Sequence, residues 1–241
     1  MQRGDTLERM TEFSPPPRHV EPTPRWIRVR AGDTWIADSR RAELLVEYGP
    51  GRLPTYILPP EDVRTDLLTP EGDLRVNGHV LERVARRVDD GWTFAWDGRV
   101  TWFEEATEVV VHPRDPKHRV DAIPSERHVV LEVGGEVVAE SRRPTAVFET
   151  SLPIRWYLPP EDVRQDLLEP SSTVTSCPYK GTARYWSVRA GGELHEDLVW
   201  SYPDPIPEQP RLKGLLAFFD ERVDLTIDGE RQDRPKTPWS R

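Results

Sequence analysis

The chain has 241 residues and a formal net charge of −9, with 36% hydrophobic and 31% charged residues. That charge argues against a dedicated binder of nucleic acid or of an anionic membrane, because both need a basic face, although dispersed arginines can still gather locally in space. A single cysteine excludes an internal disulfide and a four-thiolate zinc site, and the six histidines show no metal-ligand spacing, so we expect no metal and no cofactor.

The first part of the chain predicts a charged segment followed by β-strands. Residues 1–25 are rich in proline and charge and hold no apolar stretch, which predicts a flexible segment rather than a secretory signal. Alternating apolar positions predict strands at 26–30, 34–38 and 42–48. No apolar run approaches the roughly 20 residues of a membrane span, so we expect a cytoplasmic protein without membrane contact.

The chain also repeats itself. Residues 58–68 recur at 158–168 with ten of eleven positions identical, residues 37–41 resemble 139–143, and residues 100–105 resemble 216–221. Such self-similarity predicts two copies of one domain. The predicted order is a flexible segment at 1–25, a first β-domain at 26–115, a linker at 116–126, a second β-domain at 127–232 and a flexible tail at 233–241.

Within each copy the strands dominate, and only the repeated segment predicts a helix. Proline suits the first turn of a helix, and the acid pair Glu161 and Asp162 suits its positive end. Val163 and Leu167 then lie on one apolar stripe. Because the acid pair occurs in both copies, we expect it to maintain the fold, and we expect Ser141–Arg143 to be a solvated edge. The predicted fold class is mainly β: two tandem, small antiparallel domains, each with one short helix.

The segment Cys177–Gly181 holds the only cysteine of the chain, and it has the composition of a tight turn. Cys177 and Lys180 are the catalytic candidates, because a nearby ammonium lowers the pKa of a thiol and makes a thiolate nucleophile. The alternatives are a turn beside a binding site and a turn that is purely structural, with Cys177 buried as a small apolar residue. At an offset of 100 the first copy has Asn77-Gly-His-Val, a strong turn pair without the reactive groups, which favours a function in the second copy alone.

Aromatic residues gather around that turn in the second copy. Aromatic side chains on strands usually form a core, but tryptophan and tyrosine also line pockets for flat or cationic ligands. The candidate ligand-binding residues are Trp156, Tyr157, Tyr179, Tyr185, Trp186, Trp200 and Tyr202.

Several motifs of the second copy, taken together, resemble a known family. They are the Pro-Pro-Glu-Asp-Val segment at 159–163, Cys-Pro-Tyr-Lys-Gly at 177–181, Trp-Ser-Tyr at 200–202 and Ala-Phe-Phe-Asp-Glu at 217–221. The chain is similar to the domain-of-unknown-function family numbered 427. The resemblance implies a small antiparallel domain of the β-tent type, and automatic labels often describe the family as nucleotidyltransferase. This sequence lacks the paired carboxylates and the glycine-rich phosphate loop that nucleotidyl transfer needs.

The sequence therefore predicts an unidentified small molecule in an aromatic-lined pocket of the second copy, with catalysis left open. A non-catalytic protein-interaction module is the alternative, and nucleotidyl transfer is less favoured. An oligomer is compatible with both readings.

Overall fold

The computed structural model describes residues 14–49 and 51–240, and it is built almost entirely of strands and short turns. The chain divides into two compact units, which we call the first unit (Pro15–Asp115) and the second unit (Pro116–Arg241); Ser14 belongs to the second.

The first unit contains two larger antiparallel sheets and two small hairpins. The order β1-β4-β5 forms one sheet and β11-β10-β2-β3 the other, while β6 pairs with β7 and β8 with β9. The strands are β1 (His19–Pro22), β2 (Ile27–Ala31), β3 (Thr34–Ser39), β4 (Glu43–Val46), β5 (Thr55–Ile57), β6 (Leu74–Val76), β7 (His79–Leu81), β8 (Ala85–Val88), β9 (Gly91–Phe94), β10 (Thr101–Glu104) and β11 (Thr107–Val109).

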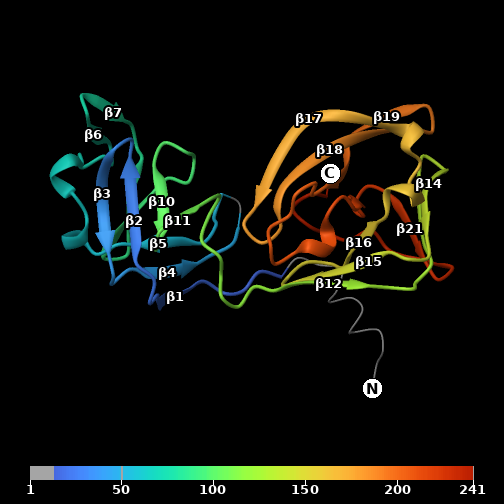
Figure 1. Ribbon diagram of the computed structural model, residues 1–241, viewed down its shortest axis with the longest axis horizontal. Helices are drawn as coiled ribbons and strands as arrows, with labels where there is room; N and C mark the ends of the chain where they lie inside the picture. The colour runs from blue at the N-terminus through green and yellow to red at the C-terminus, as the bar shows by residue number, and fades with distance from the viewer. Residues whose placement is uncertain (1–13, 50, 241) are drawn as a thin grey trace, which may run out of the picture. The chain divides into compact units, whose positions relative to one another are not determined.

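The second unit contains a seven-stranded sheet of order β12-β15-β16-β20-β19-β18-β17 and a four-stranded sheet of order β14-β13-β21-β22. Figure 1 shows the larger sheet curving from β12 and β15 at one end to the long strands β17, β18 and β19 at the other. The strands are β12 (Val120–Pro124), β13 (Val129–Val133), β14 (Glu136–Ser141), β15 (Thr145–Glu149), β16 (Arg155–Leu158), β17 (Leu168–Cys177), β18 (Gly181–Ala190), β19 (Glu193–Ser201), β20 (Leu216–Phe218), β21 (Asp224–Ile227) and β22 (Glu230–Arg231).

The strands expected near the start of each repeat are present, and they form in the same way in both units. In β2 the apolar Ile27, Val29 and Ala31 are buried and the residues between them are not, as alternation along a strand requires, and β13 has the same pattern. β2 pairs with β3, and β13 with β14, and each pairing contains a one-residue shift of register. On the other side, β2 pairs with β10 and β13 pairs with β21.

That register corrects one sequence match. Residues 100–105 were aligned with 216–221, but Trp102 lies opposite Val29 in the first unit just as Leu225 lies opposite Leu131 in the second. The true counterpart of β20 is β9, because Leu58 bridges Trp92 as Leu158 pairs with Leu216.

The predicted helix is wrong in both units. Each repeated segment forms two separate 3-10 turns, η1 (Pro60–Asp62) and η2 (Thr65–Leu67) in the first unit, η3 (Pro160–Asp162) and η4 (Gln165–Leu167) in the second. The interruption is Val63 or Val163, which is extended (φ −116° and −117°) because it bridges Ala37 or Ala139 of the neighbouring strand. A tertiary contact with β3 or β14 has thus overridden the local helical pattern.

The acid pair holds each segment against the strand that precedes it. Asp162 accepts a hydrogen bond from the Ser141 hydroxyl (2.7 Å) and pairs with Arg143 (3.0 Å), and Ser39, Arg41 and Asp62 make the same contacts in the first unit. Arg143 is therefore bound to the chain's own carboxylates, and Ser141 is buried rather than part of a solvated edge.

The segments 1–25 and 233–241 were expected to be flexible and 116–126 to be a linker, and the described parts of all three pair or bond with the rest of the chain. Residues 1–13 and 241 lie outside the described residues, but β1 falls within 1–25 and pairs with β4. Residues 116–126 include β12, which pairs with β15 from Val120 to Pro124. In the tail, the Thr237 hydroxyl donates a hydrogen bond to Glu221.

Candidate functional site

The seven-stranded sheet has two faces with different chemistry, and the predicted aromatic residues divide between them. Trp156 and Trp186 pack with Leu158, Val188 and Phe218 in the main core of the second unit. On the other face a second cluster contains Tyr157, Trp200 and Tyr202, with Tyr185 packed against it. Because successive residues of a strand point to opposite faces, Trp156 and Tyr157 cannot line the same pocket. Tyr179 lies in the turn between β17 and β18.

The Cys177–Gly181 turn delivers Lys180 to that second face. The Lys180 amide donates to the Cys177 carbonyl (3.3 Å), and the Lys180 carbonyl accepts from the Ile206 amide (3.1 Å). Gly181 has φ +113°, and a Cβ there would lie 3.3 Å from the backbone of residues 204–206. Glycine is therefore required for the turn to sit against this segment. The turn predicted from composition is confirmed.

Lys180 forms a buried ion pair with Glu149, the last residue of β15. The side chains of Lys180 and Glu149 are only 12% and 8% exposed. Glu149 also receives a hydrogen bond from His118 Nε2 (3.1 Å), and the His118 ring stacks on Tyr179 with a centroid distance of 4.2 Å. Burial alone would raise the pKa of Glu149, but the Lys180 charge and the two hydrogen bonds outweigh it and lower that pKa to about 2. Burial would lower the pKa of Lys180, yet Glu149 raises it well above its ordinary value.

The groups around this pair are held in their neutral forms. Burial raises the pKa of Tyr157 to about 12 and raises those of Tyr202 and Cys177. Trp200 Nε1 donates to the Tyr157 hydroxyl (3.0 Å), so the proton of that hydroxyl is left to donate elsewhere. The Tyr202 hydroxyl has no hydrogen-bond partner among residues 14–49 and 51–240. The site thus offers one fixed cation and two neutral donors, whereas a thiolate at Cys177 or a free amine at Lys180 is disfavoured.

A second buried charge cluster lies on the same sheet face and was not found from the sequence. Arg155 precedes Tyr157 by two residues on β16 and contacts Asp220 (3.2 Å) and Glu221 (2.8 Å). All three side chains are at most 8% exposed. Burial, followed by the charge of Glu221, raises the pKa of Asp220 to about 6 against the opposing effect of Arg155. The usable signal was the i, i+2 spacing of Arg155 and Tyr157, which puts an arginine beside the predicted aromatic residues.

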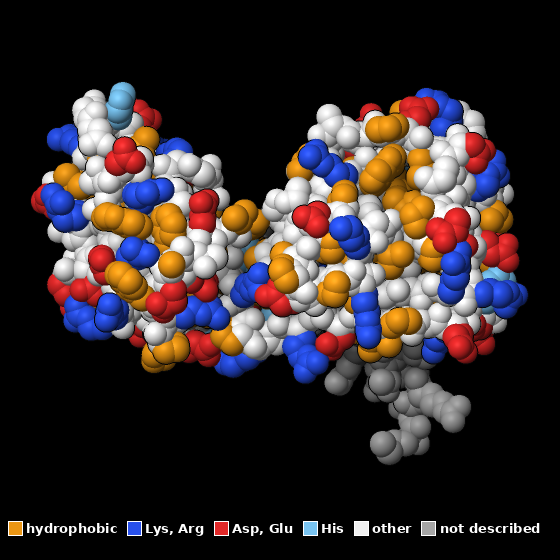
Figure 2. Space-filling model, viewed as in Figure 1, with side chains coloured by type: hydrophobic (Ala, Val, Ile, Leu, Met, Phe, Trp, Pro, Cys, Tyr) orange, Lys and Arg blue, Asp and Glu red, His pale blue; other side chains and the backbone are white. Residues whose placement is uncertain are grey.

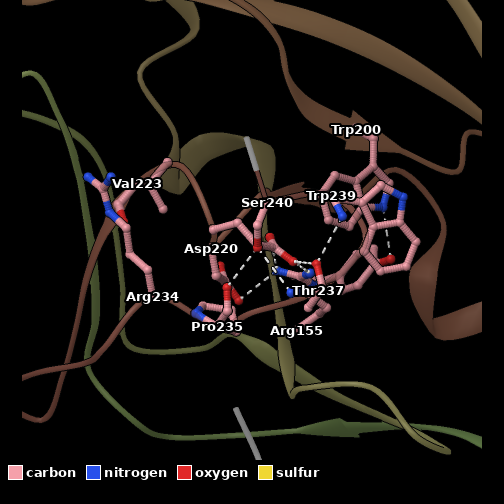
Figure 3. A network of polar contacts seen from close by, with 11 residues as sticks. Arg155, Trp200, Asp220, Val223, Arg234, Pro235, Thr237, Trp239 and Ser240 are labelled. Carbon is pink, nitrogen blue, oxygen red and sulfur yellow. Dashed lines mark hydrogen bonds and ion pairs between the residues drawn. The ribbon is translucent and has the colours of Figure 1, made fainter. Parts of the chain in front are cut away.

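The C-terminal residues contact this second cluster. Figure 3 shows Thr237 pointing toward Arg155, with Trp239 and Ser240 alongside, and the Thr237 hydroxyl donates to Glu221. The Arg155 guanidinium lies 5.9 Å from the Trp200 ring centroid, and Trp200 in turn bonds Tyr157. Trp200 and Tyr157 therefore connect the Arg155 cluster to the Lys180 cluster.

The corresponding positions of the first unit are neutral or exposed. The register places Thr55 opposite Leu45 as Arg155 is opposite Val147. Thr55 bonds Thr93 (2.6 Å) and accepts from Trp96 Nε1 (2.9 Å). The counterpart of Glu149 is Glu47, which forms a surface pair with Arg52.

An open hollow of about 510 Å³ lies along β12 rather than among the predicted aromatic residues. Its walls are residues 119–123 and 208–211, and none of the seven aromatic candidates lines it. Gln209 Nε2 and Arg211 Nη1 donate to the carbonyls of Val120 (2.7 Å) and Ala122 (2.9 Å) there.

In the part of the chain that the structure describes, no group of three His, Cys, Asp or Glu side chains is arranged to hold a metal. Nor does any described helix have the length and apolar content to cross a membrane.

The fold and these clusters define a mainly antiparallel β protein with a charged, aromatic sheet face in its second unit. The chain belongs to the family described as "Domain of unknown function (DUF427)", whose model matches residues 19–76 and 121–229, one segment in each unit. The family resemblance seen in the sequence is thereby confirmed. No curated protein matches the chain.

Proposed function

We propose that the second unit binds a small anionic molecule at the Lys180 cluster. The observation that carries the proposal is the convergence of a buried, protonated Lys180 with the neutral hydroxyls of Tyr157 and Tyr202. These groups are hydrogen-bond donors, and donors of this kind match a carboxylate or a phosphate. Glu149 neutralises and orients the ammonium, while its own oxygens are occupied by Lys180 and His118.

We further propose that the two units are tandem copies of one β-tent domain, with the ligand site kept in the second copy only. Support comes from the repeated segment, the shared strand pairings of β2 with β3 and of β13 with β14, and the family match in both units. Burial argues for a small ligand over a docking face at this site, because Tyr157, Trp200 and Tyr202 are each at most 8% exposed.

The proposal is tested by thermal-shift screening of metabolites that carry carboxylate or phosphate groups. Wild type is compared with the double variant Lys180→Met/Glu149→Gln, which removes both charges while keeping similar volumes. The matched control is Glu47→Gln in the first unit. We expect hits that raise the Tm of wild type and of the control but not of the double variant. Hits that stabilise all three proteins equally, or a screen whose only hits are cations, would contradict the proposal.

A further inference from the structure

The outer face of the four-stranded sheet in the first unit carries a stack of alternating arginine and aromatic side chains. We call this set the arginine–aromatic ladder: Arg40, Trp26, Arg28, Trp35, Phe103 and Arg30. The Arg28 guanidinium lies 4.1 Å from the Trp26 ring centroid and 4.6 Å from that of Trp35. The Arg40 guanidinium also contacts the Trp26 ring, 4.8 Å from its centroid, and the Arg30 guanidinium lies 5.3 Å from the Phe103 ring centroid. Figure 2 shows hydrophobic and basic side chains alternating over β2 and β3.

The guanidinium groups of the ladder are not neutralised by ion pairs. None of the three arginines has a carboxylate partner within the ranges 14–49 and 51–240, and Arg28 donates only to the Glu105 carbonyl (2.6 Å). Two carboxylates beside the ladder contact Trp26 instead. Asp38 accepts from its indole N–H (2.7 Å), and Glu105 from its backbone N–H (2.8 Å). Glu108 lies opposite Phe103 on the edge strand β11.

Stacking fixes the guanidinium planes and decides which parts of the ladder remain available to a ligand. The aromatic faces are covered by arginines and the Nε atoms of Arg28 and Arg30 are buried, so the groups left for a ligand are the terminal Nη groups of the guanidiniums and the edge of Trp35, which is 39% exposed. A guanidinium edge matches a carboxylate through two parallel hydrogen bonds, and a side chain that is already ordered loses less entropy on binding. Arg28 and Arg30 project from alternate residues of β2, roughly 6.6 Å apart, which is also the spacing of alternate side chains in an extended peptide.

The fold does not require the ladder. By the strand register, Arg28 corresponds to Val130, Arg30 to Glu132 and Phe103 to Thr226 in the second unit. Trp35, opposite Arg30, corresponds to Val137, opposite Glu132. The same sheet thus forms without a single member of the stack at these four positions.

We propose that this face binds an extended acidic segment of a partner protein, whose carboxylates meet the edges of Arg28, Arg30 and Arg40. Single-stranded nucleic acid is the less suitable occupant, because base stacking needs free aromatic faces and the rings of the ladder are stacked against arginines. A peptide with a few acidic residues needs neither free ring faces nor a strongly basic protein.

The test is fluorescence anisotropy of the full chain with a labelled polyglutamate peptide of about ten residues, which spans roughly 33 Å when extended. A polyglutamine peptide and an oligothymidine are the comparison probes. The variant Arg30→Gln/Arg40→Gln removes two ladder charges and spares Arg28, while Arg142→Gln alters the counterpart of Arg40 in the second unit. The conservative variant Arg30→Lys/Arg40→Lys keeps the charge and removes the planar stack.

We expect salt-sensitive binding of polyglutamate that weakens at least about tenfold in the Gln variant. It should weaken by a smaller factor in the Lys variant and remain unchanged in Arg142→Gln. Far-ultraviolet circular dichroism verifies that each variant is folded, and the Lys variant decides the outcome if the Gln variant is not. Failure of wild type to bind polyglutamate, equal binding by folded ladder variants, or tighter binding of oligothymidine than of polyglutamate would overturn the proposal.

Discussion

The two units share several strand pairings, β1-β4-β5 with β12-β15-β16 and β10-β2-β3 with β21-β13-β14, but they have different interiors. At one position of the sheet the first unit has Thr55, bonded to Thr93 and Trp96, where the second has Arg155 bonded to Asp220 and Glu221. The neutral arrangement satisfies its hydrogen bonds without burying a charge, which is the less costly way to fill such a position. The shared strand pairings therefore form without the buried charges of the second unit.

The hairpins that carry the two compared turns also differ. In the first unit Asn77 and Gly78, both with positive φ, join the short strands β6 and β7, so the Asn-Gly turn expected from the sequence is confirmed. In the second unit the ten-residue strands β17 and β18 place Lys180 against Glu149. The longer strands thus bring a buried cation to Glu149, whereas its counterpart Glu47 in the first unit has only a surface pair with Arg52.

Removal of Arg155 should have the largest effect on stability. Arg155→Met leaves two carboxylates buried without their cation, and we expect a loss of about 3–5 kcal/mol in the free energy of unfolding. Thr55→Val at the corresponding position removes neutral hydrogen bonds and should cost about 1–2 kcal/mol. Urea denaturation of the two variants measures the difference. Equal losses would contradict the expectation that the buried charges at Arg155 cost more to disrupt than the neutral hydrogen bonds at Thr55.

Substitution of Lys180 alone should come next. Lys180→Met leaves the Glu149 carboxylate buried with His118 as its remaining partner, and we expect a loss of about 2–4 kcal/mol. Glu47→Gln in the first unit breaks only a surface ion pair and should change stability by less than about 1 kcal/mol. Thermal denaturation of both variants checks this. A silent Lys180→Met would show that the ion pair is open to solvent.

Two carboxyl groups should give the stability of the protein opposite dependences on pH. The pKa of Glu149 is lowered from 4.5 to about 2, so its stabilising contribution is present above pH 4.5 and is lost as the pH falls toward 2. The pKa of Asp220 is raised from 3.8 to about 6, so its contribution is present below pH 3.8 and is lost as the pH rises through 6. At full extent the Glu149 contribution is about 3 kcal/mol.

Urea titrations between pH 2 and pH 7 separate these two contributions. Asp220→Asn should remove the loss between pH 4 and 6, and Lys180→Met/Glu149→Gln should reduce the loss below pH 4.5. If neither variant changed the pH dependence of the free energy of unfolding, the two losses of stability would not come from Glu149 and Asp220.

Tyr202→Phe should affect binding more than folding. The hydroxyl has no protein partner in the described ranges, so its removal should change stability by less than about 1 kcal/mol. If the hydroxyl donates to the ligand, affinity for a hit of the anionic screen should fall about tenfold. Calorimetric titration of that hit measures the change. Trp96→Phe in the first unit is the matched control and should leave the affinity intact.

The smallest effects should be equal in the two units. Pro60→Ala and Pro160→Ala each release the first residue of a 3-10 turn, and we expect each to cost about 0.5–1 kcal/mol through the entropy of the unfolded chain. Their Tm shifts should agree, and ligand affinity should not change. A selective loss of binding in Pro160→Ala would show that this turn belongs to the site.

The strands of both units could be predicted from alternating residues such as Ile27 and Val29, because their burial follows directly from the pleat of a strand. The helix could not, because Val63 and Val163 pair with a strand distant in sequence. Lys180 could be predicted as a site residue because it lies in a turn of distinctive composition, Cys177–Gly181. Its partner Glu149 is 31 residues away and could not be predicted without the register of β15. The Arg155 cluster was missed for the same reason, since Glu221 is 66 residues from Arg155.

If the Lys180 cluster serves ligand binding, the second unit should fold without it. The most direct measurement is the free energy of unfolding of Lys180→Met/Glu149→Gln by urea denaturation at neutral pH. Replacement of a buried ion pair by neutral groups of similar volume is often nearly neutral for stability, so we predict a value within about 1 kcal/mol of wild type. A loss of more than about 3 kcal/mol would contradict a role in ligand binding alone and make the cluster part of the folding core.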